Sequence, residues 1–456
     1  MSSPAVTYAR QNNARFLSGL KELLRIPSVS ALPENKGDCR RTAEALATEF
    51  TRIGMDNAHL IETGYNPLVY ADWLRAPGKP TVLCYGHYDV QPSDPLDEWT
   101  TPPFEPTERD GNLYGRGTAD DKGQIWVQVK ALESLLAATG KLPINVRVIL
   151  EGDEEVGGEG IENFVATEPP ELKADFALIS DTEMFAPGLP TLCVGLRGMI
   201  YTEIEVHGAK IDLHSGSYGG AAPNPFMALA EILTGLKDKN GHILIPGFYD
   251  DIIPPSPEEL KAWKSLPFDE EHYRQTEVGS PTLVGEPGFS VMERTWARPT
   301  LDVHGMPGGF TAAGAKTVIP AKALAKISMR LVPGMDAAKT FEQYKSYVEK
   351  IVPAGVTVKV RLLSAGTPSL IRVDNPYIQT ATRVLNEVWA KDTVFIRSGG
   401  SVPIVGDFER HLGAPSVMMG FGLPDDNIHA PNEKFNLKHF SLGIESIIRF
   451  LEEAGK

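Results

Sequence analysis

The sequence predicts an α/β protein with two domains. One has a mixed, mostly parallel sheet with helices on both faces, and the other is an inserted α+β domain. The chain of 456 residues exceeds one ordinary hydrophobic core. Short apolar runs alternate with helical patterns in its first part, this pattern changes near Gly195, and it returns after Asn375. We therefore assign 1–196 and 373–456 to one discontinuous domain and 197–372 to the inserted domain.

The first part of the chain alternates helix and strand patterns. Apolar residues recur at helical spacing from Tyr8 to Leu24 and from Cys39 to Ile53. Further along come a buried-strand pattern, an amphipathic helix and then two more strand patterns. Strand, helix and strand in succession predict a mostly parallel sheet covered on both faces. These elements are expected at Thr81–Tyr85, Gln124–Leu136, Asn145–Leu150 and Phe176–Ser180.

The middle of the chain follows another pattern. Tyr201–Val206 alternates apolar and acidic residues, which is typical of a strand with one wet face. Phe226–Leu236 follows a proline that the first turn of a helix tolerates, and Pro246–Pro267 is a proline-rich, acidic connection. An alternating pattern at Lys326–Leu331, a helix near Ala337–Ile351 and a strand at Val356–Leu363 are expected to follow. After Asn375 we expect a helix at Tyr377–Trp389, a strand at Ser416–Met419 and a helix at Leu442–Ala454.

Composition limits the kinds of partner. A formal net charge of −15 argues against nucleic acid and anionic membranes, which bind basic patches. No apolar run approaches the ~18 residues of a membrane span, and the N-terminus lacks the pattern of an export signal. The three cysteines are widely spaced without a Cys-x-x-Cys pair, which is typical of reduced thiols. We expect a cytoplasmic protein with no nucleic-acid or membrane partner.

Polar residues follow the first predicted strand. His87 and Asp89 come after Thr81–Tyr85 through Gly86, and residues two apart on an extended segment face the same side. Asp89 can accept the second imidazole N–H of His87 and so fix the tautomer that offers the other nitrogen to a metal. Taken alone, a His-x-Asp pair is more often an ordinary turn at the end of a strand.

Two consecutive aspartates, Asp120 and Asp121, precede the predicted helix at Gln124. Aspartate is among the best helix N-caps, so these residues could serve the helix alone. They could instead give one carboxylate to two cations. The surrounding glycines do not spell a phosphate-binding loop.

Carboxylates and a histidine mark the other predicted strand ends. Glu154 and Glu155 follow Asn145–Leu150, Asp181 follows Phe176–Ser180, and His429 lies in the polar loop after Ser416–Met419. A charge run is commonly a solvated loop, but the carboxyl ends of parallel strands are where α/β sheets bind ligands. Two divalent cations about 3.5–4 Å apart need a shared carboxylate, further oxygen and nitrogen ligands and a free carboxylate to move a proton. Together these residues could supply the shared carboxylate, the further ligands and the free carboxylate of such a site.

Four spellings resemble a known metallopeptidase family, that of glutamate carboxypeptidase, acetylornithine deacetylase, succinyl-diaminopimelate desuccinylase and the carnosinase-type dipeptidases. They are Gly86-His-Tyr-Asp-Val, Gly115-Arg-Gly-Thr-Ala-Asp-Asp-Lys-Gly, Glu151-Gly-Asp-Glu-Glu and Asn427-Ile-His-Ala-Pro-Asn-Glu. Other stretches are similar to its cytosolic non-specific dipeptidase branch, and the resemblance covers nearly the whole chain. These stretches are Asp212-Leu-His-Ser-Gly-Ser-Tyr-Gly-Gly, Ile243-Leu-Ile-Pro-Gly, Ala315-Lys-Thr-Val-Ile-Pro, Met329-Arg-Leu-Val-Pro and Gly399-Gly-Ser-Val-Pro.

The resemblance implies a role for each candidate residue near the metals. Asp120 would bridge two divalent ions and precede a cis peptide bond to Asp121. Glu154 would be the general base, and Asp89 would orient His87. The remaining ligands would be His87 and Asp181 for one ion and Glu155 and His429 for the other.

The inserted domain is implied to be a lid and dimerisation domain. His214 corresponds to a histidine that reaches the active site of the partner subunit in a homodimer, Arg330 to an arginine that binds the substrate carboxylate, and Ser401 to a residue of a substrate-contacting loop. One position departs from the dipeptidase branch. Ser398 stands where an acidic residue usually precedes Gly-Gly-Ser, which leaves the preference for a free N-terminal amine open.

We therefore expect a two-metal dipeptidase that hydrolyses small peptides with a free C-terminal carboxylate. Glu154 would take a proton from a metal-bridging water and then protonate the leaving amine, while the metals and His214 would stabilise the oxyanion. Mixed carboxylate and imidazole ligands suit Zn²⁺, Mn²⁺ or Co²⁺. The alternatives are an amidohydrolase of N-acyl amino acids and a non-catalytic metal-binding scaffold, which would have no need of the base.

Overall fold

The computed structural model describes residues 3–400 and 402–456, and the chain divides into two compact units. The first unit comprises Met1–Val194, Ile371–Ile396 and Ile404–Lys456, and the second comprises Gly195–Leu370 and Arg397–Pro403. The sequence-based division places 197–372 in the inserted domain. The short segment Arg397–Pro403 is thus a part of the second unit that lies outside that range.

A mixed sheet with a parallel centre organises the first unit. Its four central strands are parallel neighbours, and the strands that flank them are antiparallel. The central strands are apolar and almost wholly buried, as expected of strands covered on both faces. This architecture confirms the predicted fold class. The strand order is β1 (Asp56–Ile61), β2 (Leu68–Trp73), β6 (Asn145–Glu151), β3 (Thr81–His87), β7 (Phe176–Ile179), β17 (Ser416–Met418), β8 (Thr191–Leu196) and β15 (Ser369–Leu370), and β16 (Val394–Ser398) also pairs with β8.

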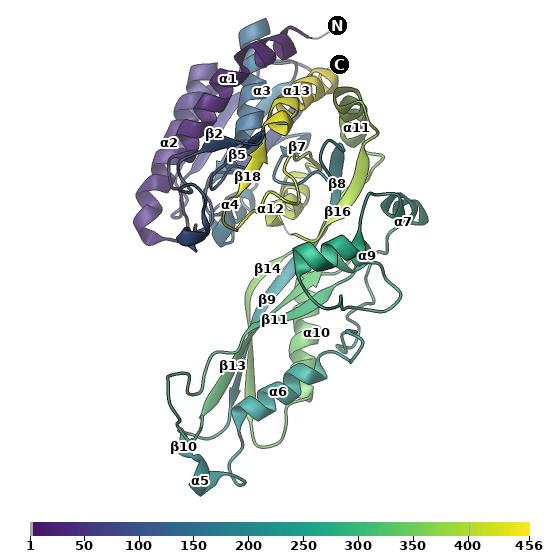
Figure 1. Cartoon of the computed structure of the whole chain (residues 1–456). Helices are drawn as coiled ribbons and strands as arrows, with labels where there is room; N and C mark the ends of the chain where they lie inside the picture. The colour runs from purple at the N-terminus through teal and green to yellow at the C-terminus, as the bar shows by residue number, and fades with distance from the viewer. Residues whose placement is uncertain (1–2, 401) are drawn as a thin grey trace. The chain divides into compact units, whose positions relative to one another are not determined.

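Long helices pack around this sheet. Helix α3 (Lys122–Thr139) is buried along most of its length because α1 (Pro4–Leu24) and α13 (Leu437–Ala454) both pack on it, and the three lie together in Figure 1. Both α1 and α13 begin earlier than apolar spacing predicts, since a polar side chain caps each first turn. The other helices are α2 (Lys36–Ile53), α4 (Glu159–Val165), α11 (Pro376–Trp389) and α12 (Pro403–Asp407).

An antiparallel sheet forms the second unit, in the order β11 (Thr300–Gly305), β13 (Lys322–Leu331), β9 (Gly198–His207) and β14 (Thr357–Gly366). Apolar residues on one face of this sheet, among them Ile204 and Ile327, form a core with α6 (Pro225–Gly235) and α10 (Ala337–Lys350). The other face carries the more exposed residues of the alternating strands. This arrangement agrees with the predicted α+β pattern.

The proline-rich connection at Pro246–Pro267 contains a helix that the sequence analysis missed. Ser256 caps the first turn of helix α7 (Pro257–Lys264). Its side chain accepts a hydrogen bond from the backbone N–H of Glu259, and the Glu259 side chain accepts one from the backbone N–H of Ser256. This reciprocal capping offsets the proline-rich context. A further helix, α9 (Val291–Trp296), starts with the same capping arrangement at Ser290.

Smaller elements complete the structure. Strands β4 (Thr107–Arg109), β5 (Asn112–Tyr114) and β18 (Lys434–Asn436) form a small antiparallel sheet in the first unit. In the second unit β10 (Leu213–His214) pairs with β12 (Val318–Ile319), and the short helices α5 (Ser215–Tyr218) and α8 (Glu270–His272) lie in loops. Within the described chain no helix is both long and apolar enough to cross a membrane. The three cysteines are buried free thiols.

Candidate metal centre

The central parallel strands of the first unit bring the candidate ligands to one edge of the sheet. β3 ends at His87, β6 ends just before the short turn that holds Glu154 and Glu155, and β7 ends two residues before Asp181. The carboxyl ends of parallel neighbours lie together. Asp120 precedes α3 and His429 follows β17, and both approach this edge.

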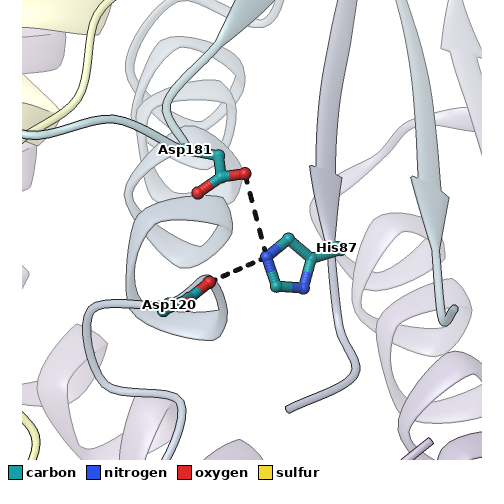
Figure 2. A group of neighbouring side chains, drawn as sticks. All are labelled: His87, Asp120 and Asp181. Carbon is teal, nitrogen blue, oxygen red and sulfur yellow. Dashed lines mark hydrogen bonds and ion pairs between the residues drawn. The ribbon is translucent and has the colours of Figure 1, made fainter. Parts of the chain in front are cut away.

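His87, Asp120 and Asp181 form the first of two ligand groups. The imidazole Nε2 of His87 lies 2.9 Å from Oδ1 of Asp120 and 3.9 Å from Oδ2 of Asp181. Figure 2 shows both carboxylates pointing at this one nitrogen. His87 is fully buried, so its ring has a single fixed direction.

Asp120, Glu155 and His429 form the second group. The imidazole Nε2 of His429 lies 2.8 Å from Oδ2 of Asp120 and 3.3 Å from Oε2 of Glu155. In each group the candidate ligand atoms lie within 4.8 Å of one another. The two oxygens of Asp120 therefore face different histidines, an arrangement that can share one carboxylate between two cations.

Asp89 connects His87 with the turn that carries the glutamates. The Nδ1 atom of His87 lies 3.1 Å from the main-chain oxygen of Asp89 and 3.4 Å from its Oδ1. The Asp89 carboxylate also accepts hydrogen bonds from the backbone N–H groups of Glu154, at 3.3 Å, and Glu155, at 3.1 Å. One buried carboxylate thus contacts both the imidazole and the glutamate turn.

Burial of so many acids perturbs their protonation. Burial raises the pKa of Asp181 to about 7, with a further rise from the negative charge of Asp120. Burial likewise raises the pKa of Glu154 well above its usual range, and the neighbouring carboxylates Asp181 and Glu155 add to the rise. A buried cluster of this kind needs positive charge to hold its carboxylates ionised.

The carboxylates of the cluster in turn shift the pKa of the two histidines. Hydrogen bonds to Asp120 and Glu155 raise the pKa of His429 to about 10. For His87, burial acts to lower the pKa, but the carboxylates of Asp120 and Asp89 outweigh it and the pKa rises. The shared Asp120 is also desolvated, yet its bonds with His429 and His87 hold its pKa below the usual range. A divalent cation bound at either group would take the place of a histidine proton, so the residues of each group fit a metal ion.

Several residues support this edge in ways that were not predicted from the sequence. The side-chain amide of Gln91 donates to Oε2 of Glu155 at 2.8 Å, and Asp121 accepts from the backbone N–H of His87 at 3.1 Å. The carboxylate of Asp153 accepts two hydrogen bonds from Asn66, at 2.8 and 2.7 Å, which holds the glutamate turn. A signal existed for Gln91, since it follows Asp89 at the same two-residue spacing that links Asp89 to His87. The peptide bond between Asp120 and Asp121 is cis, which confirms that expectation.

The remaining predicted site residues belong to the second unit. His214 ends β10 with an exposed side chain whose Nδ1 accepts from the backbone N–H of Gly216 at 3.0 Å. Arg330 lies on β13, and burial lowers the pKa of its guanidinium. Ser401 lies outside the described residues. Its neighbours Gly399 and Gly400 accept hydrogen bonds through their carbonyl groups from Arg197, at 2.9 and 3.2 Å.

The sequence of residues 83–453 matches the model of "Peptidase family M20/M25/M40". The chain belongs to the M20 peptidase family. This assignment confirms the resemblance noted in the sequence, including its dipeptidase branch, and makes the protein a metallopeptidase.

Similar M20 proteins match over nearly their whole length. The chain is 32% identical to the Cys-Gly metallodipeptidase dug1 of Schizosaccharomyces pombe, over 96% of this chain and 95% of that protein. It is 31% identical to the human Beta-Ala-His dipeptidase, over 98% and 91%. The solved structure of the M20 family metallo-carboxypeptidase Sso-CP2 from Sulfolobus solfataricus superposes with a TM-score of 0.86 at 32% identity, covering 96% of this chain and 99% of that one.

Proposed function

We propose that this M20 protein is a two-metal dipeptidase that hydrolyses the peptide bond of dipeptides with a free C-terminal carboxylate. One observation carries the two-metal proposal, namely that the two oxygens of Asp120 face two separate imidazole and carboxylate groups. The dipeptide substrate is supported by the similar proteins, which include a Cys-Gly and a Beta-Ala-His dipeptidase.

Each cation would have its own ligands in addition to the shared Asp120. His87 and Asp181 would complete one site, and Glu155 and His429 would complete the other. Imidazole and carboxylate ligands suit Zn²⁺, Mn²⁺ and Co²⁺. When bound, the cations would polarise the scissile carbonyl and make the attacking water more acidic.

Glu154 is proposed as the general base. Among the described residues neither ligand group includes it, although it is adjacent to Glu155 and the carboxylate of Asp89 holds its backbone N–H. In this mechanism Glu154 removes a proton from the water that attacks the scissile carbonyl carbon. It then delivers that proton to the leaving amine nitrogen as the peptide C–N bond breaks.

The second unit is proposed to bind the substrate. Arg330 offers a partly buried guanidinium, the group best shaped to hold a terminal carboxylate through two hydrogen bonds. Ser401 is proposed to contact the substrate, and His214 to contribute to the active site of the partner subunit in a homodimer. These roles rest on the family resemblance.

Removal of metal should abolish activity, and this tests the proposed function directly. Without cations, no group in the cluster would polarise the scissile carbonyl or make the attacking water more acidic. Dialysis against a chelator is expected to remove dipeptide hydrolysis, and added manganese, cobalt or zinc is expected to restore it. Full activity in protein shown by elemental analysis to be metal-free would contradict the mechanism.

Mixed dimers test the proposed action of His214 in trans. Inactive His214→Ala subunits and inactive Glu154→Gln subunits are mixed and allowed to exchange. One of the two sites in each mixed dimer then has both wild-type groups, so about half of the activity of a wild-type dimer should return. If labelled subunits exchange and no activity returns, His214 does not act across the dimer.

An amidohydrolase of N-acyl amino acids is the second candidate, and one contact favours keeping it. Ser398 Oγ accepts from the backbone N–H of Gly400 at 3.1 Å, so this position offers a hydroxyl already engaged with its own loop rather than a carboxylate for an amine. A panel of free and N-acetylated dipeptides separates the two candidates. A non-catalytic scaffold predicts no turnover of either class with any of the three metals.

A further inference from the structure

Glu433 makes an unusual number of contacts for a residue that neither ligand group contains. Its side chain is fully buried. Oε2 accepts hydrogen bonds from Nη1 of Arg116 at 2.8 Å and the backbone N–H of Gly117 at 2.9 Å. Oε1 accepts from the backbone N–H groups of Ala119, at 2.9 Å, and Asp120, at 3.1 Å. The carboxylate therefore holds the loop that presents Asp120.

The backbone around Glu433 ties the same loop to the segment that carries His429. The main-chain oxygen of Glu433 accepts from the backbone N–H of Gly115 at 2.9 Å. Immediately after Glu433, β18 pairs with β5, the strand that leads into the Asp120 loop. Side chain and main chain thus both join two segments that are more than 300 residues apart in sequence.

The loop of His429 depends on such contacts for its shape. Asn427, His429 and Asn432 all have positive φ values, 54°, 61° and 62°, a conformation that costs free energy for residues with a side chain and persists only where neighbours hold it. The Asn432 side chain accepts from the backbone N–H of Thr100 and donates to the carbonyl of Glu98, each at 2.8 Å. Glu433 is the next residue after this anchor.

We propose that Glu433 is a positioning residue for the metal centre, which fixes Asp120 and His429 relative to one another. This role of Glu433 rests on the proposed two-metal function. In it Glu433 touches neither a cation nor the substrate. It acts through Asp120, whose two oxygens must point at two different imidazoles at once. A small rotation of the Asp120 loop would move both oxygens together and would weaken both sites.

The charge of Glu433 suits this role. Arg116, which is also buried, pairs with this carboxylate at 2.8 Å and offsets its negative charge. A carboxylate offers acceptors on both oxygens, whereas an amide replaces one of them with a donor. Glutamine at this position would therefore turn an N–H donor toward two backbone N–H groups and would leave Arg116 without a negatively charged partner.

The test is cobalt binding by full-length, metal-stripped protein, measured by competition with a chelator and by the visible absorption of bound Co²⁺. Substitution of residues that orient metal ligands commonly lowers affinity about 10–100-fold, and Glu433→Gln is expected to fall in this range with an altered cobalt spectrum. Glu433→Asp keeps the charge that Arg116 needs but is one methylene shorter. It is expected to fold and to bind several-fold more weakly than the wild type.

Glu445→Gln is the matched control. Glu445 is a buried glutamate on α13 that pairs with guanidinium groups, those of Arg10 at 2.7 Å and Arg449 at 2.8 Å, and it belongs to neither ligand group. This variant should lower thermal stability without changing cobalt affinity or spectrum. Wild-type affinity and spectrum in whichever Glu433 variants fold would overturn the proposal. Wild-type protein that binds no cobalt would overturn the two-metal function and this inference together.

Discussion

Glu154→Gln is expected to abolish dipeptide hydrolysis while leaving metal content near the wild-type value. Glutamine is nearly the same size but cannot accept the proton of the attacking water, and general acid–base catalysis contributes about 10²–10⁴-fold to rates. The loss should fall almost entirely in kcat, because Glu154 lies outside both ligand groups. Steady-state kinetics with a dipeptide and elemental analysis of the same sample measure the two quantities.

The neighbouring residue provides the contrast for this substitution. Glu155→Gln makes the same chemical change one position further along, but Glu155 faces His429 at 3.3 Å and belongs to a ligand group. This variant should lose affinity for one cation as well as activity. If Glu154→Gln instead lost both metals, Glu154 would be a ligand and the assignment of the base would be wrong.

Asp120→Ala is expected to lose both cations and all measurable activity. The substitution removes an oxygen 2.9 Å from His87 and another 2.8 Å from His429, so each site loses the ligand that faces its histidine. Metal content per subunit after gel filtration, together with hydrolysis at saturating manganese or zinc, measures the result.

Asp425→Ala is the control for general effects of removing an aspartate near the site. Asp425 is exposed and pairs with Lys434 on the His429 side, at 3.1 Å, and it belongs to neither ligand group. This variant should retain both metals. An Asp120→Ala protein that kept two cations would show that Asp120 does not bridge them.

Some elements of the fold were predictable because burial imposes a pattern on the sequence. The central strands β3, β6 and β7 contain runs of apolar residues because both of their faces are covered. The buried strands β2 and β8 were nevertheless missed, and so was β1, none of whose residues is buried and half of which are polar. Helix α7 was missed because its capping box lies within a proline-rich stretch.

The grouping of the candidate site residues was also predictable from the sequence, but their detailed geometry was not. Parallel strands end at one edge, so residues after their ends, such as His87 and Asp181, could be grouped before any coordinates were known. Only the structure shows that each oxygen of Asp120 faces a separate imidazole. Glu433 could not be assigned a role from sequence, because it acts through hydrogen bonds to residues far along the chain, whereas Gln91 offered only its two-residue spacing from Asp89. The catalytic and ligand roles themselves stay predictions.

Because the first unit is discontinuous in sequence, its proposed metal ligands are synthesised at different times. His87, Asp120, Glu155 and Asp181 all leave the ribosome before the second unit, whereas His429 leaves after it. Helix α13, which packs on α3, is made last. A nascent chain would therefore expose four of the five proposed ligands before His429 is made, and the proposed group of Asp120, Glu155 and His429 could close only after the second unit has been synthesised.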